Sequence, residues 1–344
     1  MIDPGYVSLL DSGELEERVE RLYGLLSACT VCPRNCGNDR LAGVLASCAS
    51  GADPVVSAYT PHLGEEPVLS GTKGAGNIFF GNCNLRCVYC QNFQISQDYA
   101  GQLRNTASVE RVAQMMLELE ARGCHNIGFV SPTHYAPQMA RAILLAAREG
   151  LRLPIVYNTN AYDSVEVLRL LDGIVDIYLP DLKYADSAAG WTYSKVPAYA
   201  ERAREALIEM YRQKGSRLVL GEDGLLKSGL LVRVLVLPNN AAGVGDSLAW
   251  IAEALSPRVA VSLMAQYYPI HRAAGGGRYE TLGRSITAAE WEEALSSLAG
   301  NGLEQGFQQE LETANRYYRP DFRDRDTPFR DIRDFPEARS QTGS

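Results

Sequence analysis

Six short apolar runs, each followed by a segment with helical spacing, constrain the fold of this chain more than any other feature. The runs expected to form strands are residues 76–80, 126–130, 153–160, 175–184, 229–238 and 259–269. The segments expected to form helices are residues 108–123, 137–150, 164–173, 197–215, 245–255 and 288–302. Strands that are apolar along their whole length are buried on both faces, so we expect a parallel sheet covered by helices. Ligand sites in such folds gather at the carboxyl ends of the strands.

The composition indicates a globular protein in a reducing compartment. Of its 344 residues, 46% are hydrophobic and 22% are charged. No apolar run approaches the roughly 18 residues that span a bilayer, so no membrane partner is expected. A formal net charge of -8 argues against a nucleic-acid partner, which needs a basic surface. The first residues lack the basic and apolar regions of a secretory signal, which predicts a cytoplasmic protein.

Seven of the eight cysteines fall between residues 29 and 90. In a reducing cytoplasm, such clustering indicates metal ligands or catalysis rather than disulfides. The first set consists of Cys29, Cys32, Cys36 and Cys48. It offers the four thiols that a zinc ion or an iron–sulfur cubane requires. The second set consists of Cys83, Cys87 and Cys90. If the first set closes on itself, a cubane held by the second has one iron free for a small molecule.

The spacing C-x3-C-x2-C, with Tyr89 before the last cysteine, resembles the signature of the radical S-adenosylmethionine (SAM) superfamily. Segments between about residues 29 and 300 look like an uncharacterised branch related to pyruvate formate-lyase activating enzyme; they include "CPRNCG", "SPTHYAPQ", "DIYLPDLKY" and "VRVLVLP". The resemblance implies a partial (β/α)6 TIM-like barrel, a [4Fe-4S] cluster and SAM bound at the open iron. It also implies an electron donor such as flavodoxin or ferredoxin.

The same resemblance assigns cofactor contacts to residues at the expected strand ends. These are Tyr89 for the adenine, Ser131 and Thr133 for the amino group of SAM, and Thr159 and Asp181 for a monovalent cation and the SAM carboxylate. The acidic residue that precedes the threonine in the family is Asn158 here. One anionic ligand of the cation site is therefore missing.

Several other residues near strand ends are candidates whose roles stay open. Arg233 lies in an apolar strand, so we expect it to face the lumen and to meet a carboxylate of SAM, of the substrate or of another side chain. His134 is either a proton donor or substrate contact, or a hydrogen-bonded histidine at the rim. Asp181 and Lys183 are alternatively an ordinary ion pair. Further candidates for the lumen are Gln266 and Tyr267.

Three regions follow from these assignments. We expect a cysteine-rich N-terminal module at residues 1–74, the barrel at 75–312 and a charged tail at 313–344. The metal of the first cysteine set, zinc or an auxiliary [4Fe-4S] cluster, would stabilise so small a module. The tail is rich in charges and prolines with little apolar periodicity, so we expect it to be loosely packed.

The leading functional hypothesis is an oxidoreductase that cleaves SAM reductively at the cluster and abstracts hydrogen from a substrate. One candidate substrate is a glycine in a partner glycyl-radical enzyme, and the other is a C–H group of a small molecule or peptide, as in radical epimerisation. An epimerase needs a cysteine or tyrosine that returns hydrogen, but Cys124 is expected at the wrong end of the barrel, in the core. Candidate tyrosines are Tyr135, Tyr162 and Tyr267. Non-enzyme alternatives are an iron–sulfur electron-transfer protein and a zinc-stabilised scaffold.

Overall fold

The computed structural model describes residues 3–311, 320–324 and 327–329. In this part of the chain, nine strands form one mostly parallel sheet in the order β1-β2-β3-β4-β5-β7-β8-β9, with β6 paired to β7. The strands are β1 (Val56–His62), β2 (Ala75–Phe80), β3 (Ile127–Val130), β4 (Ile155–Thr159), β5 (Ile177–Pro180), β6 (Val219–Leu220), β7 (Leu226–Leu235), β8 (Ala260–Met264) and β9 (Gly306–Gln308). β1 runs antiparallel to β2 and β6 antiparallel to β7, whereas all other pairs are parallel.

The six expected strands correspond to β2, β3, β4, β5, β7 and β8, which confirms the mostly parallel sheet. β1 and β9 lie outside the expected runs and extend the sheet at its two edges. Neither has a long apolar run, because β9 has three residues and β1 contains Pro61. Proline has no N–H to donate to a neighbouring strand and is therefore confined mostly to edge strands. A run that contains Pro61 is accordingly a weak sequence signal for a strand.

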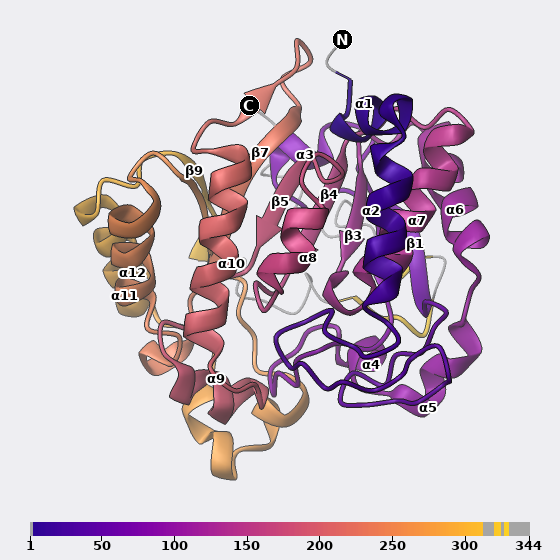
Figure 1. Ribbon diagram of the computed structural model, residues 1–344. Helices are drawn as coiled ribbons and strands as arrows, with labels where there is room; N and C mark the ends of the chain where they lie inside the picture. The colour runs from indigo at the N-terminus through magenta and orange to yellow at the C-terminus, as the bar shows by residue number, and fades with distance from the viewer. Residues whose placement is uncertain (1–2, 312–319, 325–326, 330–344) are drawn as a thin grey trace.

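Helices cover the sheet, and α2, α7, α8 and α10 lie in front of it in Figure 1. The α-helices are α1 (Gly5–Ser12), α2 (Glu14–Gly24), α3 (Pro67–Ser70), α4 (Phe93–Ser96), α5 (Tyr99–Gln102), α6 (Val109–Ala121), α7 (Ala136–Arg148), α8 (Val165–Leu170), α9 (Ser187–Ser194), α10 (Tyr199–Lys214), α11 (Val244–Trp250) and α12 (Ala288–Gly300). At the lower edge of this view lie α4, α5, α9 and the indigo-to-purple loops that follow α2 in the chain.

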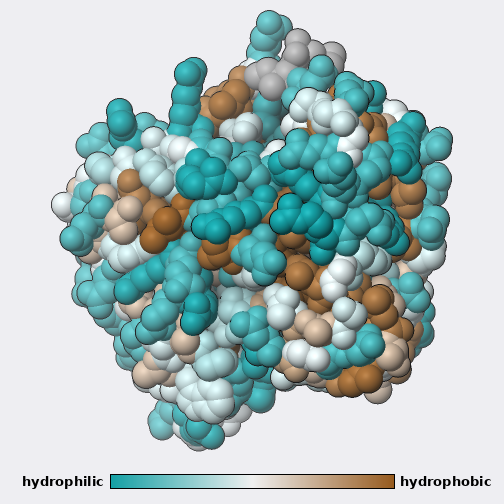
Figure 2. Space-filling view, in the orientation of Figure 1, coloured by the Kyte–Doolittle hydropathy of each residue, from teal (hydrophilic) through white to brown (hydrophobic). Residues whose placement is uncertain are grey.

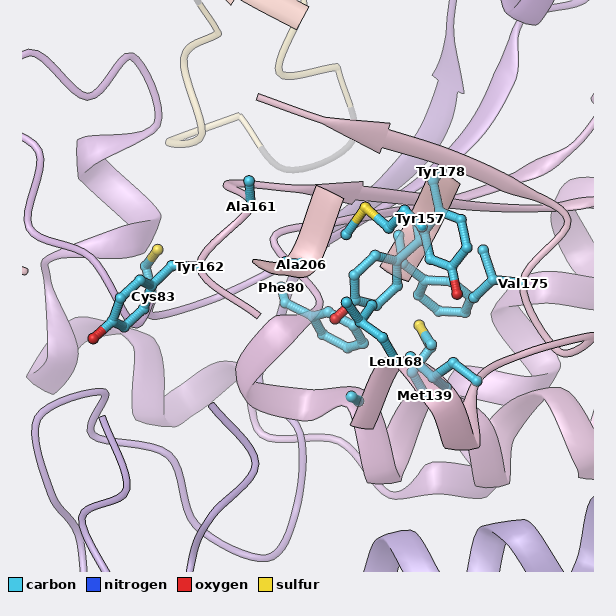
Figure 3. Close-up of a cluster of buried hydrophobic side chains, with 14 of the residues drawn as sticks. Phe80, Cys83, Met139, Tyr157, Ala161, Tyr162, Leu168, Val175, Tyr178 and Ala206 are labelled. Carbon is cyan, nitrogen blue, oxygen red and sulfur yellow. The ribbon is translucent and has the colours of Figure 1, made fainter. Parts of the chain in front are cut away.

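One continuous core joins the sheet to the helices on its outer face. Figure 3 shows part of it, where the rings of Tyr157 and Tyr178 lie close to Met139 and Leu168. Tyr6 of α1 and the apolar face of α2 belong to the same core. α1 and α2 thus pack on the main core and β1 is part of the main sheet, and the division of the chain into an N-terminal module and a barrel stays a prediction.

A second, smaller core lies on the inner face of the sheet. Leu69 of α3 packs there against Val156, Ile177 and Leu231. These residues come from β4, β5 and β7, so α3 covers the inner face below the strand ends. The space above α3 is left for a cavity.

Part of the expected charged tail packs on the sheet. Phe322 is buried beside Phe79 and Val130, and Phe329 packs on the same cluster. The ring centroids of Phe79 and Phe322 are 5.3 Å apart. This packing differs from the loose packing expected for these residues, and the rest of the tail lies outside the described residues.

The surface in the orientation of Figure 1 is mostly hydrophilic, with apolar side chains in separate patches (Figure 2). Within the described ranges, every helix is too short or too polar to cross a membrane.

Candidate active site

A cavity of about 630 Å³ lies at the carboxyl ends of the parallel strands. Its walls include His62 at the end of β1 and Phe307 of β9, so the sheet curves around one space. Because the loops after successive strands converge here, residues far apart in the sequence meet. The predicted residues that line the cavity are Cys83, Cys87, Tyr89, Cys90, Ser131, Thr159, Asp181, Lys183, Arg233, Gln266 and Tyr267. Thr133 and His134 do not line it.

The loop after β2 carries the three cysteines into the cavity. Asn82 has a φ of 65°, a left-handed conformation that asparagine adopts more readily than most residues. Its amide donates to the carbonyl of Ile95 at 2.8 Å, so the loop folds back on α4. The amide of Cys90 donates to the carbonyl of Cys87 at 3.3 Å. In Figure 3, Cys83 lies at one end of the drawn cluster, away from the tyrosines of β4 and β5.

These three residues fit a cubane held at three corners. All are free thiols, and the cavity beside them has room for a ligand. Burial raises the pKa of the Cys83 thiol and raises that of Cys90 to about 12. The thiols of Cys83 and Cys90 are therefore protonated at neutral pH until iron binds, and iron binding to them releases protons. Among the described residues, no group of three or more histidine, cysteine or acidic side chains is already arranged as a metal site.

Asp181 and Lys183 form an ion pair at the cavity wall, with Nζ and Oδ2 2.8 Å apart. Burial alone would lower the pKa of Lys183, but the Asp181 carboxylate and the Cys87 thiol nearby raise it above its usual value. The backbone amide of Lys183 also donates to the hydroxyl of Tyr199 at 2.9 Å. The pair is therefore fixed in position near the cysteines.

Arg233 enters the cavity from β7 and binds two carboxylates of the loop before α3. Its Nε donates to Glu66 at 2.8 Å, and Nη2 donates to Glu66 at 2.5 Å and to Glu65. Burial opposes ionisation of Glu65, but the guanidinium outweighs it and lowers the pKa of Glu65 to about 2. Arg233 was expected to meet a carboxylate of SAM, of the substrate or of another side chain. In the structure, it meets the carboxylates of two other side chains. The sequence analysis missed both glutamates, although a buried arginine requires an acidic partner and "EEP" precedes β2.

Thr159 ends β4 and is held by a buried carboxyl group. Its hydroxyl donates to Asp163 Oδ2 at 2.5 Å and lies 3.0 Å from the hydroxyl of Thr133. Burial raises the pKa of Asp163 above its usual value, against the hydrogen bonds that it accepts. Thr133 therefore supports Thr159 from behind, whereas Ser131 lines the cavity itself. Asp163 was missed by the sequence analysis and gives no distinct sequence signal.

Tyr89 presents its ring to the cavity between two other tyrosines. The ring centroids of Tyr89 and Tyr267 are 5.9 Å apart and those of Tyr89 and Tyr184 are 6.4 Å apart, both edge to face. Burial raises the pKa of the Tyr89 hydroxyl well above its usual value. The hydroxyl is therefore neutral, and the ring is held rigidly for an aromatic contact.

His134 and Cys124 lie away from the cavity. His134 is buried, its Nε2 lies 3.0 Å from the carbonyl of Gly81, and burial lowers its pKa to about 3. This places it as a neutral, hydrogen-bonded histidine behind the cysteine loop. Cys124 is buried in the main core just before β3, at the opposite end of that strand from the cavity.

The N-terminal cysteines lie in a segment that packs on the cysteine loop. Cys29, Cys32 and Cys48 are buried and Cys36 is exposed. Burial is the largest cause that raises the pKa of Cys32 to about 12, and the thiols of Cys48 and Cys29 contribute to the same shift. These groups are therefore close enough to interact, although a preformed metal geometry is absent from the described residues.

Two arginines hold this segment in place. Arg34 donates to the carbonyls of Asn84 at 2.6 Å and Lys195 at 2.8 Å. Arg40 is buried and donates to the carbonyl of His134 at 2.7 Å and twice to that of Gly51, at 2.8 and 3.1 Å. The segment is thus joined to the loops that follow β2 and β3.

Comparisons with known proteins find sequence relatives of part of this chain. Residues 77–226 match the family model of the radical SAM superfamily. The uncharacterized protein MJ0674 of Methanocaldococcus jannaschii is 29% identical over 239 residues, which cover 68% of this chain and 64% of the relative. The uncharacterized protein MJ0808 of the same organism is 25% identical over 169 residues, which cover 45% of this chain and 49% of the relative. The chain therefore spans less than two thirds of the length of either relative. Because both are described only as uncharacterized, the resemblance to pyruvate formate-lyase activating enzyme stays a prediction.

Proposed function

Starting from the radical SAM domain that this chain carries, we propose an enzyme that cleaves SAM reductively and abstracts hydrogen from a substrate. The superfamily implies a [4Fe-4S] cluster, SAM and a reductant. The observation that carries the proposal is the position of Cys83, Cys87 and Cys90. They line one cavity together with Tyr89 of the same loop and with Asp181, which follows β5. That arrangement combines a three-thiol iron site with polar groups for a bound ligand.

When bound, the cluster supplies one electron and SAM supplies a sulfonium C–S bond, whose cleavage yields methionine and a 5'-deoxyadenosyl radical. The residues of the chain bind and orient. The Lys183–Asp181 pair and the Thr159 hydroxyl offer charged and polar contacts to the methionine moiety, and the Tyr89 ring offers an aromatic surface to the adenine. Apolar side chains such as Phe79 on the same walls limit the access of water to a radical.

The two candidate substrates differ in what they require of the cavity. A thiol-dependent epimerase needs a cysteine beside the substrate, yet Cys83, Cys87 and Cys90 are the only cysteines among the described residues that line the cavity. We therefore put activation of a glycyl-radical enzyme first. Radical modification or epimerisation of a small molecule or peptide stays the alternative, with Tyr267 as the lining tyrosine that would return hydrogen.

The N-terminal cysteine set is proposed to hold zinc or an auxiliary [4Fe-4S] cluster. Three of its four thiols are buried in a segment that contacts the cysteine loop through Arg34. Metal binding would supply folding energy to a segment with little secondary structure. Iron and zinc contents of anaerobically purified protein distinguish the two metals.

The test of the proposed function is the formation of 5'-deoxyadenosine. Anaerobically reconstituted protein is incubated with dithionite and SAM, and the products are separated by chromatography. We expect 5'-deoxyadenosine and methionine in equal amounts. Protein with an intact, reduced cluster that forms neither product would sink the proposal. A glycyl-radical enzyme that gains a glycyl radical signal when this protein is added would establish a glycine of that enzyme as the substrate.

A further inference from the structure

A buried polar side chain lies against the sulfur of each cluster cysteine. The best placed is Ser194, the last residue of α9, whose hydroxyl donates to Cys87 Sγ at 2.9 Å. Ser194 is fully buried, and its Oγ lies 2.6 Å from the hydroxyl of Tyr184. Because Ser194 has one proton, which it gives to the sulfur, Tyr184 must donate to Ser194. The tyrosine thus fixes the direction of the serine hydroxyl.

The other two cysteines have longer contacts of the same kind. Ser96 Oγ of α4 lies 3.3 Å from Cys90 Sγ. Either atom can donate while the sulfur is a thiol, but a sulfur bound to iron has lost its proton, so the serine then donates. Asn160 Nδ2 lies 3.6 Å from Cys83 Sγ. Both side chains are buried, so neither is merely an exposed polar group.

We propose that Ser194, Ser96 and Asn160 set the reduction potential of the cluster, an inference that rests on the proposed function. A hydrogen bond to a ligand sulfur stabilises negative charge on the cluster, and the reduced state carries one more negative charge than the oxidised state. The donors therefore raise the potential, as hydrogen bonds to cluster sulfurs do in general. Burial strengthens each bond because the local dielectric constant is low. This cluster thus accepts an electron from a weaker reductant than it would without the three donors.

Charged groups near the cluster also affect its reduction potential, and the variants used in the test leave these groups unchanged. Lys183 is paired with Asp181 at 2.8 Å, so the pair has no net charge. The guanidinium of Arg86 donates to the backbone carbonyls of Cys83 at 2.5 Å and Leu85 at 2.7 Å. A shift in potential on removing one hydroxyl is therefore assigned to the hydrogen bond and not to these charges.

The experiment is a redox titration of the anaerobically reconstituted full chain without SAM, followed by electron paramagnetic resonance of the reduced cluster. We expect Ser194→Ala to lower the ratio of reduced to oxidised cluster at a fixed potential about three- to tenfold, where tenfold corresponds to about 59 mV for a one-electron couple. Ser194→Thr keeps a hydroxyl and should restore the wild-type midpoint. Tyr184→Phe should lower the midpoint potential, as Ser194→Ala does, but by a smaller amount. Ser247→Ala removes a buried serine of α11 and is the matched control without a shift.

Ser96→Ala tests the proposal on a separate element if Ser194→Ala lowers the iron content. Because its contact is longer, we expect a smaller negative shift. Wild-type midpoints in both variants at full iron content would overturn the inference. Failure of the proposed function has a different signature, since the shifts would be present while the reduced cluster left SAM uncleaved.

Discussion

The two cysteine sets of this chain lie next to each other but are held in different ways. The loop of Cys83, Cys87 and Cys90 follows β2, which is paired on both sides, and faces a cavity lined by the ends of neighbouring strands. The N-terminal set lies in residues 25–55, where the described chain has no regular helix or strand. The sheet therefore positions Cys83, Cys87 and Cys90 before any metal binds, whereas the N-terminal set depends on a few polar contacts and on its metal. The predictions below test this difference.

The largest effect is expected at the loop that the sheet positions. Cys87→Ala removes one of three cluster ligands, so we expect SAM cleavage to fall to background, measured as 5'-deoxyadenosine from dithionite-reduced protein. The fold and the metal of the N-terminal set should be retained. Cys124→Ala is the control, since that thiol is buried outside both sets, and it should keep most of the activity. A fully active Cys87→Ala protein contradicts the ligand assignment.

Substitutions in the N-terminal set should affect metal content and soluble yield first. In Cys32→Ser, we expect metal content and soluble yield to fall first, with a decrease in Tm on the order of 10 °C, because the metal supplies folding energy to the segment. Elemental analysis and thermal unfolding measure both. Cys124→Ala again serves as the control. If Cys32→Ser retains all its zinc and iron and its Tm, the four thiols hold no metal.

The difference between the sets also explains what could be predicted from the sequence. The apolar runs predicted six parallel strands because burial on both faces leaves a continuous hydrophobic pattern. The cysteine loop was predicted because its three residues are close in sequence and follow such a strand. Once the strand ends are placed together, Thr159 and Asp181 reach the same cavity.

Contacts that depend on tertiary packing could not be predicted in this way. Glu65 reaches Arg233 only because α3 covers the inner face of the sheet. Ser194 meets Cys87 across 107 residues of sequence, and no local pattern marks it. Phe322 belongs to a segment whose charge and prolines indicate loose packing, yet it is buried beside Phe79. Sequence periodicity indicates which face of one element is buried. These contacts depend instead on how two elements pack together, so periodicity does not predict them.

Arg40 should account for much of the stability of the N-terminal segment. Arg40→Met leaves the buried carbonyl of His134 and the half-buried carbonyl of Gly51 without these donors, so we expect the free energy of unfolding to fall by about 2–4 kcal/mol. Urea unfolding of the anaerobic protein measures it. Arg202→Ala removes an exposed arginine that pairs with Glu205 and should change stability by less than about 0.5 kcal/mol. Equal stability of Arg40→Met and the wild type would mean that the segment is held by other contacts.

The smallest effect is expected at Arg34, the residue that joins the two sets. Arg34→Ala removes the bond to the Asn84 carbonyl, beside Cys83, while leaving every thiol in place. If the N-terminal segment steadies the cysteine loop, the rate of SAM cleavage should fall about two- to tenfold, the upper value corresponding to about 1.4 kcal/mol. Metal content should not change. Arg34→Lys keeps the charge but lacks the fork that spans two carbonyls, so its rate should lie between those of Arg34→Ala and the wild type. A wild-type rate in Arg34→Ala with full metal content would show that the two sets act independently, and the N-terminal metal would then stabilise its own segment alone.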